Sequence, residues 1–209
     1  MNTTEGKPRY SFGEEIANSV THGIGILLSV AGLVLMVVFA ARYGDTWHVV
    51  STAVFGAALI FLYTASTLYH AVPSFHAKSV LQTLDHSAIF LLIAGTYTPF
   101  TLVSLRGPWG WTLFGVIWAA AIFGFVMQFT PLRRFKVLSL VLYVGMGWAV
   151  VAAFRPLLAA VPAPGILLLL AGGISYTAGI GFYLWRRLPY SHAIWHVFVL
   201  AGSLFHFFA

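Results

Sequence analysis

Long apolar stretches alternate with short polar interruptions along this chain. The apolar stretches run approximately over residues 18–41, 47–71, 81–105, 109–129, 135–154, 164–185 and 191–208. A helix of about 20 apolar residues crosses the roughly 30 Å hydrocarbon core of a bilayer. The interruptions hold turn formers, such as Gly107-Pro108 and Pro162. The pattern therefore predicts an all-α polytopic membrane protein, a bundle of seven transmembrane helices.

The connections between the apolar stretches are too short to separate domains. Residues 1–209 are therefore predicted to form a single seven-helix membrane domain. Ahead of the first stretch, Ser11 and Glu14 have the spacing of a helix capping box. Residues 1–17 are accordingly predicted to form a cytoplasmic N-terminal segment whose short helix leads into the first span.

The composition supports a membrane protein and excludes some chemistry. Hydrophobic residues make up 60% of the 209 positions and charged residues 8%, whereas soluble domains carry about 25% charged residues. The absence of cysteine excludes disulfides, thiolate metal ligands and a cysteine nucleophile. The net charge of +6 is scattered between apolar stretches, so the chain is not expected to bind nucleic acid.

The basic residues predict the orientation in the membrane. The N-terminus and the second, fourth and sixth loops hold eight of them: Lys7, Arg9, Lys78, Arg133, Arg134, Lys136, Arg186 and Arg187. The opposite side holds three, namely Arg42, Arg106 and Arg155. Because cytoplasmic loops carry an excess of Lys and Arg, we expect a cytoplasmic N-terminus and an external C-terminus in a bacterial plasma membrane.

Three histidines near the cytoplasmic ends of two predicted spans are candidate metal ligands. His192 and His196 are one helical turn apart in the last span, and His70 ends the second span. Histidines at i and i+4 can bind one ion from a single helix face, and a third on a neighbouring helix leaves an open fourth position. Zn²⁺ suits three imidazoles well, although iron, copper and nickel also accept this ligand.

Other polar residues are predicted to lie at the same depth. Asp85, near the start of the third span, could hold a water at the metal, and Ser66, one turn before His70, could orient a ligand or a substrate oxygen. Glu15, Asn18 and His22 share a face of the first helix, which makes them candidate supporting residues around the ligands. Ionisable groups inside a membrane by default indicate a function or a buried pair.

Each of these features alone has a simpler interpretation. A pair of histidines one turn apart in a helix is more often not a metal site, and a lone serine usually bonds the carbonyl one turn back. An aspartate beside a loop is usually a favourable charge at a helix start. Their coincidence at one depth on several helices favours the metal site.

The segments that carry these residues resemble a known family. "EEIANSVTHGIG", "STLYHAV", "LDHSAIFLLIAGTYTP" and "SHAIWHVF" are similar to the bacterial hemolysin III proteins of the progestin and adiponectin-Q receptor family. This family belongs to a wider superfamily of membrane hydrolases that includes alkaline ceramidases. The resemblance implies seven helices, a cytoplasmic N-terminus and zinc held by the histidines that match His70, His192 and His196.

The resemblance also implies roles for the remaining candidates. Asp85 matches the acidic residue that holds the zinc water, and Ser66 matches the serine one turn before the first ligand. Glu15, Asn18 and His22 match the first block of the family. The resemblance to the eukaryotic receptors covers only the membrane core and not their long N-terminal domain, so hormone reception is not expected.

Three functions follow from these features. The first is a zinc-dependent, ceramidase-like hydrolysis of lipid amides or esters, with Asp85 moving the proton and a third span weakened at Gly95 and Pro99 beside a lipid cavity. The second is a metal-clipped sensor or regulator of lipid composition. The third, a cytolytic pore, is disfavoured because the middle spans, such as residues 113–127, carry no polar stripe along their length. Membrane lipid is the expected partner, as substrate or ligand.

Overall fold

The computed structural model describes residues 10–185 and 187–209, apart from the side chain of Phe75. Within these residues, seven helical spans are long and apolar enough to cross a membrane, which confirms the predicted number. The spans begin with α1 (Phe12–Tyr43), α2 (Thr46–Ala71), α3 (Phe75–Pro99), α4 (Pro108–Met127), α5 (Lys136–Trp148), α7 (Ala163–Leu184) and α8 (Ser191–Phe208). The third span runs on to Ser104 and the fifth to Ala160. The π-helical η1 (Phe100–Ser104) continues α3, the 3₁₀ turn η2 (Pro131–Arg134) precedes α5, and η3 (Ala149–Ala153) and α6 (Phe154–Ala160) continue α5.

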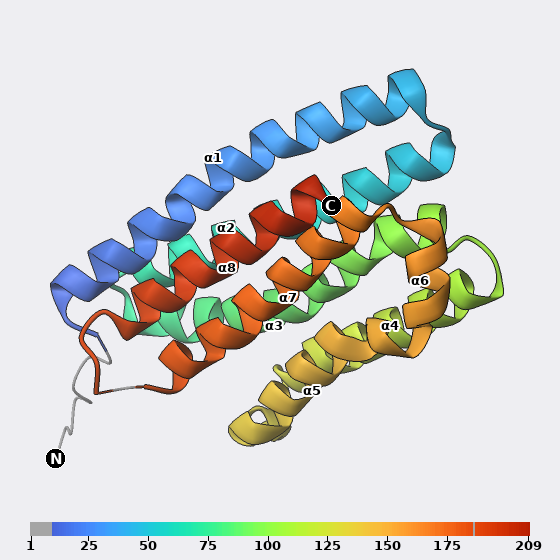
Figure 1. Ribbon diagram of the computed structural model, residues 1–209. Coiled ribbons are helices and arrows are strands. Elements are labelled where there is room, and N and C mark those ends of the chain that lie inside the picture. The colour runs from blue at the N-terminus through green and yellow to red at the C-terminus, as the bar shows by residue number, and fades with distance from the viewer. Residues whose placement is uncertain (1–9, 186) are drawn as a thin grey trace, which may run out of the picture.

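Successive spans run in opposite directions, so α1, α3, α5 and α8 all begin at one end of the bundle, on the lower left of Figure 1. This end is called the N-terminal end below. Helix α1 packs on α2 and α8, α3 lies between α2 and α4, and α7 packs on α8. Helix α5 makes only sparse contacts with its neighbours α3, α4 and α7. The bundle is therefore least tightly packed around α5, on the sides of both α4 and α7.

A hydrogen-bonded cap joins the beginnings of the first and last helices. Ser11 and Glu14 form the predicted capping box at the start of α1, which then runs without a break into the first span. The same Glu14 accepts a hydrogen bond of 3.0 Å from the backbone N–H of Tyr190, which precedes α8 in the left-handed conformation with φ of 56°. Since non-glycine residues rarely adopt this conformation, the Glu14 contact helps to hold the chain there. Lys7 and Arg9 lie outside the described residues.

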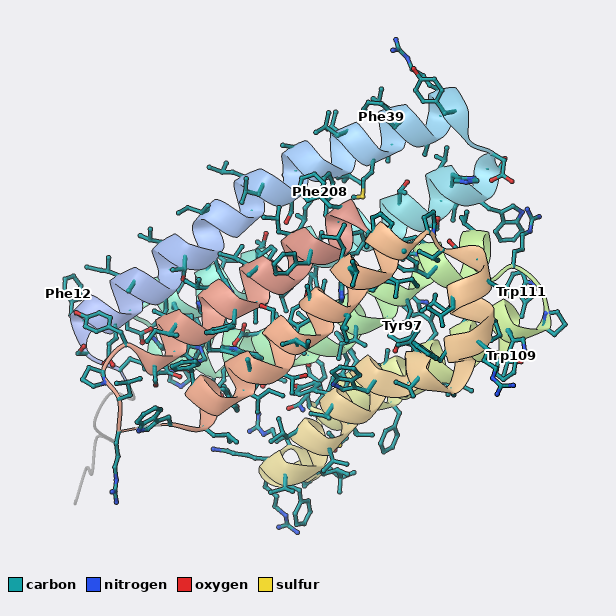
Figure 2. The ribbon with its side chains drawn as sticks, in the orientation of Figure 1. Phe12, Phe39, Tyr97, Trp109, Trp111 and Phe208 are labelled. Carbon is teal, nitrogen blue, oxygen red and sulfur yellow. The ribbon has the colours of Figure 1, made fainter. Side chains whose placement is uncertain are left out.

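The outer surface of the bundle is apolar. Phe12 and Phe39 project from the two halves of α1, Trp109 and Trp111 lie at the start of α4, and Phe208 ends α8 (Figure 2). All five side chains are exposed. Soluble monomers rarely expose continuous apolar surface on this scale, whereas lipid-facing helices require it. The chain is a multi-pass membrane protein.

Helix α3 is the most enclosed span and changes geometry after Pro99. The ring of Pro99 removes one backbone donor, and the π-helical segment η1 follows directly. This confirms the predicted weakening at Pro99. At Gly95 the helix is unbroken, in contrast to the prediction. A Cβ there would lie 2.7 Å from the Cβ of Ala58, so glycine instead allows α3 to approach α2.

A single tyrosine connects α3 to the place where α5 changes into a 3₁₀ helix. Tyr97 donates a 2.9 Å hydrogen bond to the carbonyl of Gly147 and accepts one from the N–H of Val150. Figure 2 shows Tyr97 between α3 and this part of α5. The hydroxyl thus replaces backbone bonds that the interrupted helix does not make.

Candidate metal centre

Three histidines from two helices come together near the N-terminal end of the bundle. His70 is the penultimate residue of α2, while His192 and His196 occupy the first two turns of α8. The ring centroid of His70 lies 5.1 Å from that of His192 and 5.3 Å from that of His196. The centroids of the two α8 rings are 4.5 Å apart. Their exposed fractions are only 3%, 9% and 1%. The pattern of two histidines at i and i+4 and a third on a neighbouring helix therefore forms in space.

A carboxylate from α1 fixes the orientation of the His70 ring. Glu15 Oε2 lies 2.6 Å from His70 Nδ1, and Glu15 Oε1 lies 2.5 Å from Lys78 Nζ. Because a carboxylate only accepts, Nδ1 carries the hydrogen. The longer contact of 3.4 Å between Asn18 Nδ2 and the same nitrogen is then not a second hydrogen bond to it. Nε2 is the nitrogen of His70 that would bind an ion.

The backbone of α1 orients His196 in the same way. His196 Nδ1 lies 3.2 Å from the carbonyl oxygen of Asn18 and 3.2 Å from Thr21 Oγ1. The Thr21 hydroxyl donates to backbone carbonyls of its own helix, including that of Ala17 at 2.8 Å, so it accepts from the ring. Nδ1 therefore carries the hydrogen, and Nε2 of His196 is left with a lone pair. A second hydrogen bond of this kind is the usual support of a metal-ligating imidazole.

Two further aromatic rings pack against the ligand candidates. His22 of α1 stacks on His196 with centroids 3.5 Å apart, and neither of its buried ring nitrogens has a hydrogen-bond partner among the described residues. Tyr10, just before α1, lies 5.5 Å from the ring of His70 and 5.1 Å from that of His192. Tyr10 thus covers the cluster from the N-terminal end.

The three histidines fit a small divalent cation. One potential ligand nitrogen from each residue lies within 4.8 Å of the others. A tetrahedral zinc ion with Zn–N bonds of about 2.0 Å places its nitrogens about 3.3 Å apart, so modest side-chain rotations close the set. Neutral imidazoles held by their second nitrogen are the appropriate donors. The buried cluster could hold a metal ion, and the identity of that ion stays a prediction.

Ser66 lies one turn from His70 and lacks the bond that would explain it as a packing residue. Its side chain is fully buried, and its hydroxyl has no hydrogen-bond partner among the described residues. Other hydroxyls in the spans, such as those of Ser87 and Thr98, bond the carbonyl four residues earlier. The simpler interpretation of Ser66, a bond to its own helix, is therefore wrong.

Asp85 lies on α3 at the same height as Ser66 on α2. A hydrogen bond of 3.0 Å from Gln82 to the hydroxyl of Tyr69 sets the register of these antiparallel helices. Ser66 and Asp85 each lie three residues deeper than this pair. Asp85 is 7% exposed and lines the same cavity as His192 and His196. The structure thus brings Asp85 to the depth of the cluster, while the chemical roles of Asp85 and Ser66 stay predictions.

A cavity of about 430 Å³ extends from this cluster through the middle of the bundle. Its walls come mainly from α3, α5, α7 and α8, the helices on either side of the sparse α5–α7 contact. Beyond Asp85 the lining is largely apolar, with Ile89, Leu92 and Val144 as examples. Ligand pockets in proteins commonly have about 300–1,000 Å³. A chain-like apolar group beside the histidine cluster is therefore a suitable occupant.

Three residues that contact the histidine cluster or its supporting residues were not predicted from the sequence. Thr21 follows Asn18 by three residues, so helical spacing could have placed it on the same face. Lys78 and Tyr10 come from segments flanking the spans, where spacing gives no signal. Conversely, the predicted supporting residues Glu15, Asn18 and His22 all contact a candidate ligand.

Comparison with known proteins agrees with this arrangement. A family model described as Haemolysin-III related matches residues 10–207. The chain belongs to this family. It is 47% identical over 199 residues to a hemolysin-3 homolog of Bacillus subtilis (strain 168), which covers 95% of this chain and 93% of the relative. It is 48% identical over 195 residues to the hemolysin-3 of Bacillus cereus, with 93% and 89% covered.

The haemolysin III relationship extends to animals. The chain is 29% identical over 207 residues to the human monocyte to macrophage differentiation factor, covering 94% of this chain and 82% of the relative. The match begins at Tyr10 and ends at Phe207, so it includes every candidate site residue. The resemblance inferred from the sequence blocks is confirmed.

Proposed function

We propose that this haemolysin III protein is a zinc-dependent hydrolase of lipid amides or esters. The observation that carries the proposal is the buried cluster of His70, His192 and His196, which adjoins a largely apolar cavity inside a membrane-spanning bundle. A hydrophilic substrate would not suit that cavity, and a purely structural polar cluster would not need an adjoining one.

Zinc would be held by Nε2 of His70 and Nε2 of His196, together with the His192 ring. When bound, it supplies Lewis acidity and lowers the pKa of water at its open position to about 7. Glu15 and the Asn18 carbonyl keep the two oriented rings in the tautomer that binds a cation. The chain's own residues then position the substrate and move protons.

Asp85 is proposed as the general base and acid. It accepts a proton from the attacking water and later donates a proton to the nitrogen or oxygen of the departing head. The Ser66 hydroxyl, which has no partner among the described residues, donates a hydrogen bond to the oxyanion that develops on the carbonyl. The acyl chain enters from the lipid through the sparse contact between α5 and α7. The N-terminal end is proposed to face the cytoplasm.

The test is turnover of a panel of lipid amides and esters by purified, zinc-loaded protein. Asp85→Asn should lower kcat about 10²–10⁴-fold while leaving the metal content unchanged. Asp45→Asn is the matched control, because Asp45 is an exposed acid at the opposite end of the bundle. Equal turnover by wild type and Asp85→Asn, or none by zinc-loaded wild type across the panel, would contradict the proposal.

A metal-clipped lipid sensor is the second candidate. It is favoured by the way the cluster connects α2 to α8 and, through Glu15 and Asn18, to α1. In that case ligand binding in the cavity would change stability without product formation. The lytic activity in the names of the bacterial relatives has no such support here, since exposed residues of α4 such as Val116 and Ile122 are apolar. Release of dye from vesicles that contain the purified protein would revive it.

A further inference from the structure

The mouth of the cavity at the N-terminal end carries a cluster of positive charge. Arg133, Arg134 and Lys136, from η2 and the first residue of α5, all line the cavity. The three residues are exposed, so they form its rim. Asp85 is the one carboxylate among the lining residues in the part of the chain that the structure describes. The rim therefore holds three basic residues, while the described lining of the cavity holds one carboxylate.

The two arginines of the rim keep hydrogen-bonding capacity. Arg133 Nη1 donates to Thr83 Oγ1 of α3 at 3.2 Å, which holds the guanidinium across the mouth. Arg134 lies over the ring of Phe135, 4.9 Å from its centroid. Neither arginine takes part in an ion pair with a carboxylate of residues 10–185 or 187–209. A guanidinium has five donors in a planar fork, and this geometry matches phosphate and carboxylate groups.

Membrane topology explains the presence of basic residues at this end but not their convergence. The excess of Lys and Arg in cytoplasmic loops is equally satisfied by Arg187, which is exposed in the α7–α8 connection and does not line the cavity. Arg133, Arg134 and Lys136 instead gather where the cavity meets the surface. This placement indicates a ligand with a negative group at the mouth.

The short distance between the cavity mouth and Asp85 indicates how a ligand would be arranged in the cavity. Thr83, which Arg133 contacts, and Asp85 are two residues apart on α3, a rise of about 3 Å. Beyond Asp85 the lining is apolar, from Ile89 to Ile93 on α3. A ligand anchored by its negative group at the rim would therefore place its next few atoms beside Asp85 and its hydrocarbon chain in the apolar part.

We propose that Arg133, Arg134 and Lys136 select acyl amides or esters whose head group carries a negative charge, such as a phosphate or a carboxylate. The proposal rests on the proposed function, because it names the substrate class of the same site. The shared chemistry is an anionic head on a single acyl chain. Water-soluble anions of the same charge supply the head without the chain and bind weakly.

Binding to the Asp85→Asn variant tests this without depending on turnover. The probes are N-palmitoylglycine, the neutral N-palmitoylethanolamine of equal chain length, N-acetylglycine and inorganic phosphate, each titrated in nonionic detergent while thermal unfolding is followed. N-palmitoylglycine should bind at least about tenfold more tightly than the neutral amide. The two soluble anions should give no shift at the same concentration.

Three variants separate recognition from general surface charge. Arg133→Gln/Arg134→Gln in the Asp85→Asn background should abolish the preference for the anionic amide, whereas Arg133→Lys/Arg134→Lys should keep most of it. Arg187→Gln, which removes one charge outside the cavity, should leave the preference unchanged. If the double glutamine variant does not fold, the single variant Arg134→Gln should reduce the preference several-fold.

The outcomes distinguish this proposal from the hydrolase. A preference that survives Arg133→Gln/Arg134→Gln, or is lost equally in Arg187→Gln, overturns the recognition site. A thermal shift with inorganic phosphate as large as that with N-palmitoylglycine shows a simple anion site and overturns the lipid selection. A clear preference for the anionic amide with no hydrolysis by zinc-loaded wild type would support the recognition site and contradict only the catalytic role.

Discussion

The bundle buries two clusters of polar side chains, one of hydroxyls and one of histidines. They differ in how many of their polar atoms form hydrogen bonds within the protein. Seven residues from His70 along α2, and seven from His196 along α8, the hydroxyl group of Tyr63 donates to Ser203 Oγ at 2.7 Å. Tyr176 of α7 shares the same Ser203 at 2.9 Å. By helical rise this hydroxyl cluster is about 10 Å deeper than the histidine cluster. Each of its hydroxyls has a partner inside the protein.

The histidine cluster has the opposite property. Ser66 Oγ, Asn18 Oδ1 and both ring nitrogens of His22 are buried without hydrogen-bond partners among the described residues. Buried polar atoms are nearly always hydrogen-bonded, and exceptions indicate a ligand, an ion or water. The comparison teaches that burial of polar groups alone does not identify a site. The hydroxyl cluster is explained by helix packing, whereas the histidine cluster leaves polar atoms that a ligand, an ion or water could bind.

Removing one ligand gives the largest expected difference between the two clusters. His196→Ala should reduce bound zinc from one ion per chain to near zero, because two imidazoles no longer define a closed set. Ser203→Ala, on the same helix, should keep the full ion. Elemental analysis of protein purified without metal-binding tags measures both. Full zinc occupancy in His196→Ala would show that the ion binds elsewhere.

Metal removal should affect stability only through the histidine cluster. A ligand present at about a thousandfold above its Kd stabilises the folded state by about 4 kcal/mol. Chelation of wild type should therefore lower Tm strongly, and added zinc should restore it. The chelator should leave the Tm of His196→Ala unchanged. An equal response of wild type and this variant would contradict the assignment.

The carboxylate behind His70 should have an intermediate effect. Glu15→Gln keeps the volume of the side chain but removes the negative charge that accepts the hydrogen bond from His70 Nδ1. Loss of such a partner lowers metal affinity about 10–100-fold. Lys78→Gln is the control, since it breaks the Lys78–Glu15 pair and leaves the contact with His70. Competition with a coloured chelator measures the two affinities. Equal losses would show that orientation of His70 is not the cause.

The smallest expected effects are on the unfolding free energy of two serine variants, and they should differ between the two clusters. Ser203→Ala leaves the hydroxyls of Tyr63 and Tyr176 without their shared partner and should cost about 1–3 kcal/mol of unfolding free energy. Ser66→Ala removes a buried hydroxyl that has no partner among the described residues, so stability should stay within about 1 kcal/mol of wild type or rise. Turnover should fall in Ser66→Ala only. Denaturation in mixed micelles measures the unfolding free energy of both variants. A loss of stability in Ser66→Ala would show that this hydroxyl contributes to packing.

The number of spans and the shared face of His192 and His196 could be predicted because both depend on local spacing. Twenty apolar residues require a membrane helix whatever their neighbours, and His192 and His196 share a face whenever their segment is helical. Interruptions were harder to predict. The 3₁₀ segment after Trp148 depends on Tyr97, which is about fifty residues away and supplies its hydrogen bonds.

The supporting contacts show the same limit more clearly. Glu15, Asn18 and His22 could be grouped by helical spacing, but the sequence did not predict which ring each would contact. That choice depends on the packing of α1 between α2 and α8. Lys78 reaches Glu15 from the start of α3, and no spacing rule relates the two residues. The charges of the α4–α5 connection could be counted for topology, whereas their place at a cavity mouth required the fold.

The ligand set also has a consequence for biosynthesis. One imidazole leaves the ribosome with the second span and the other two with the seventh, so a nascent chain that lacks α8 holds one ligand of three. Capture of a metal ion by these three residues would therefore come after insertion of the last span. A loaded ion would report that the whole chain had been threaded into the membrane.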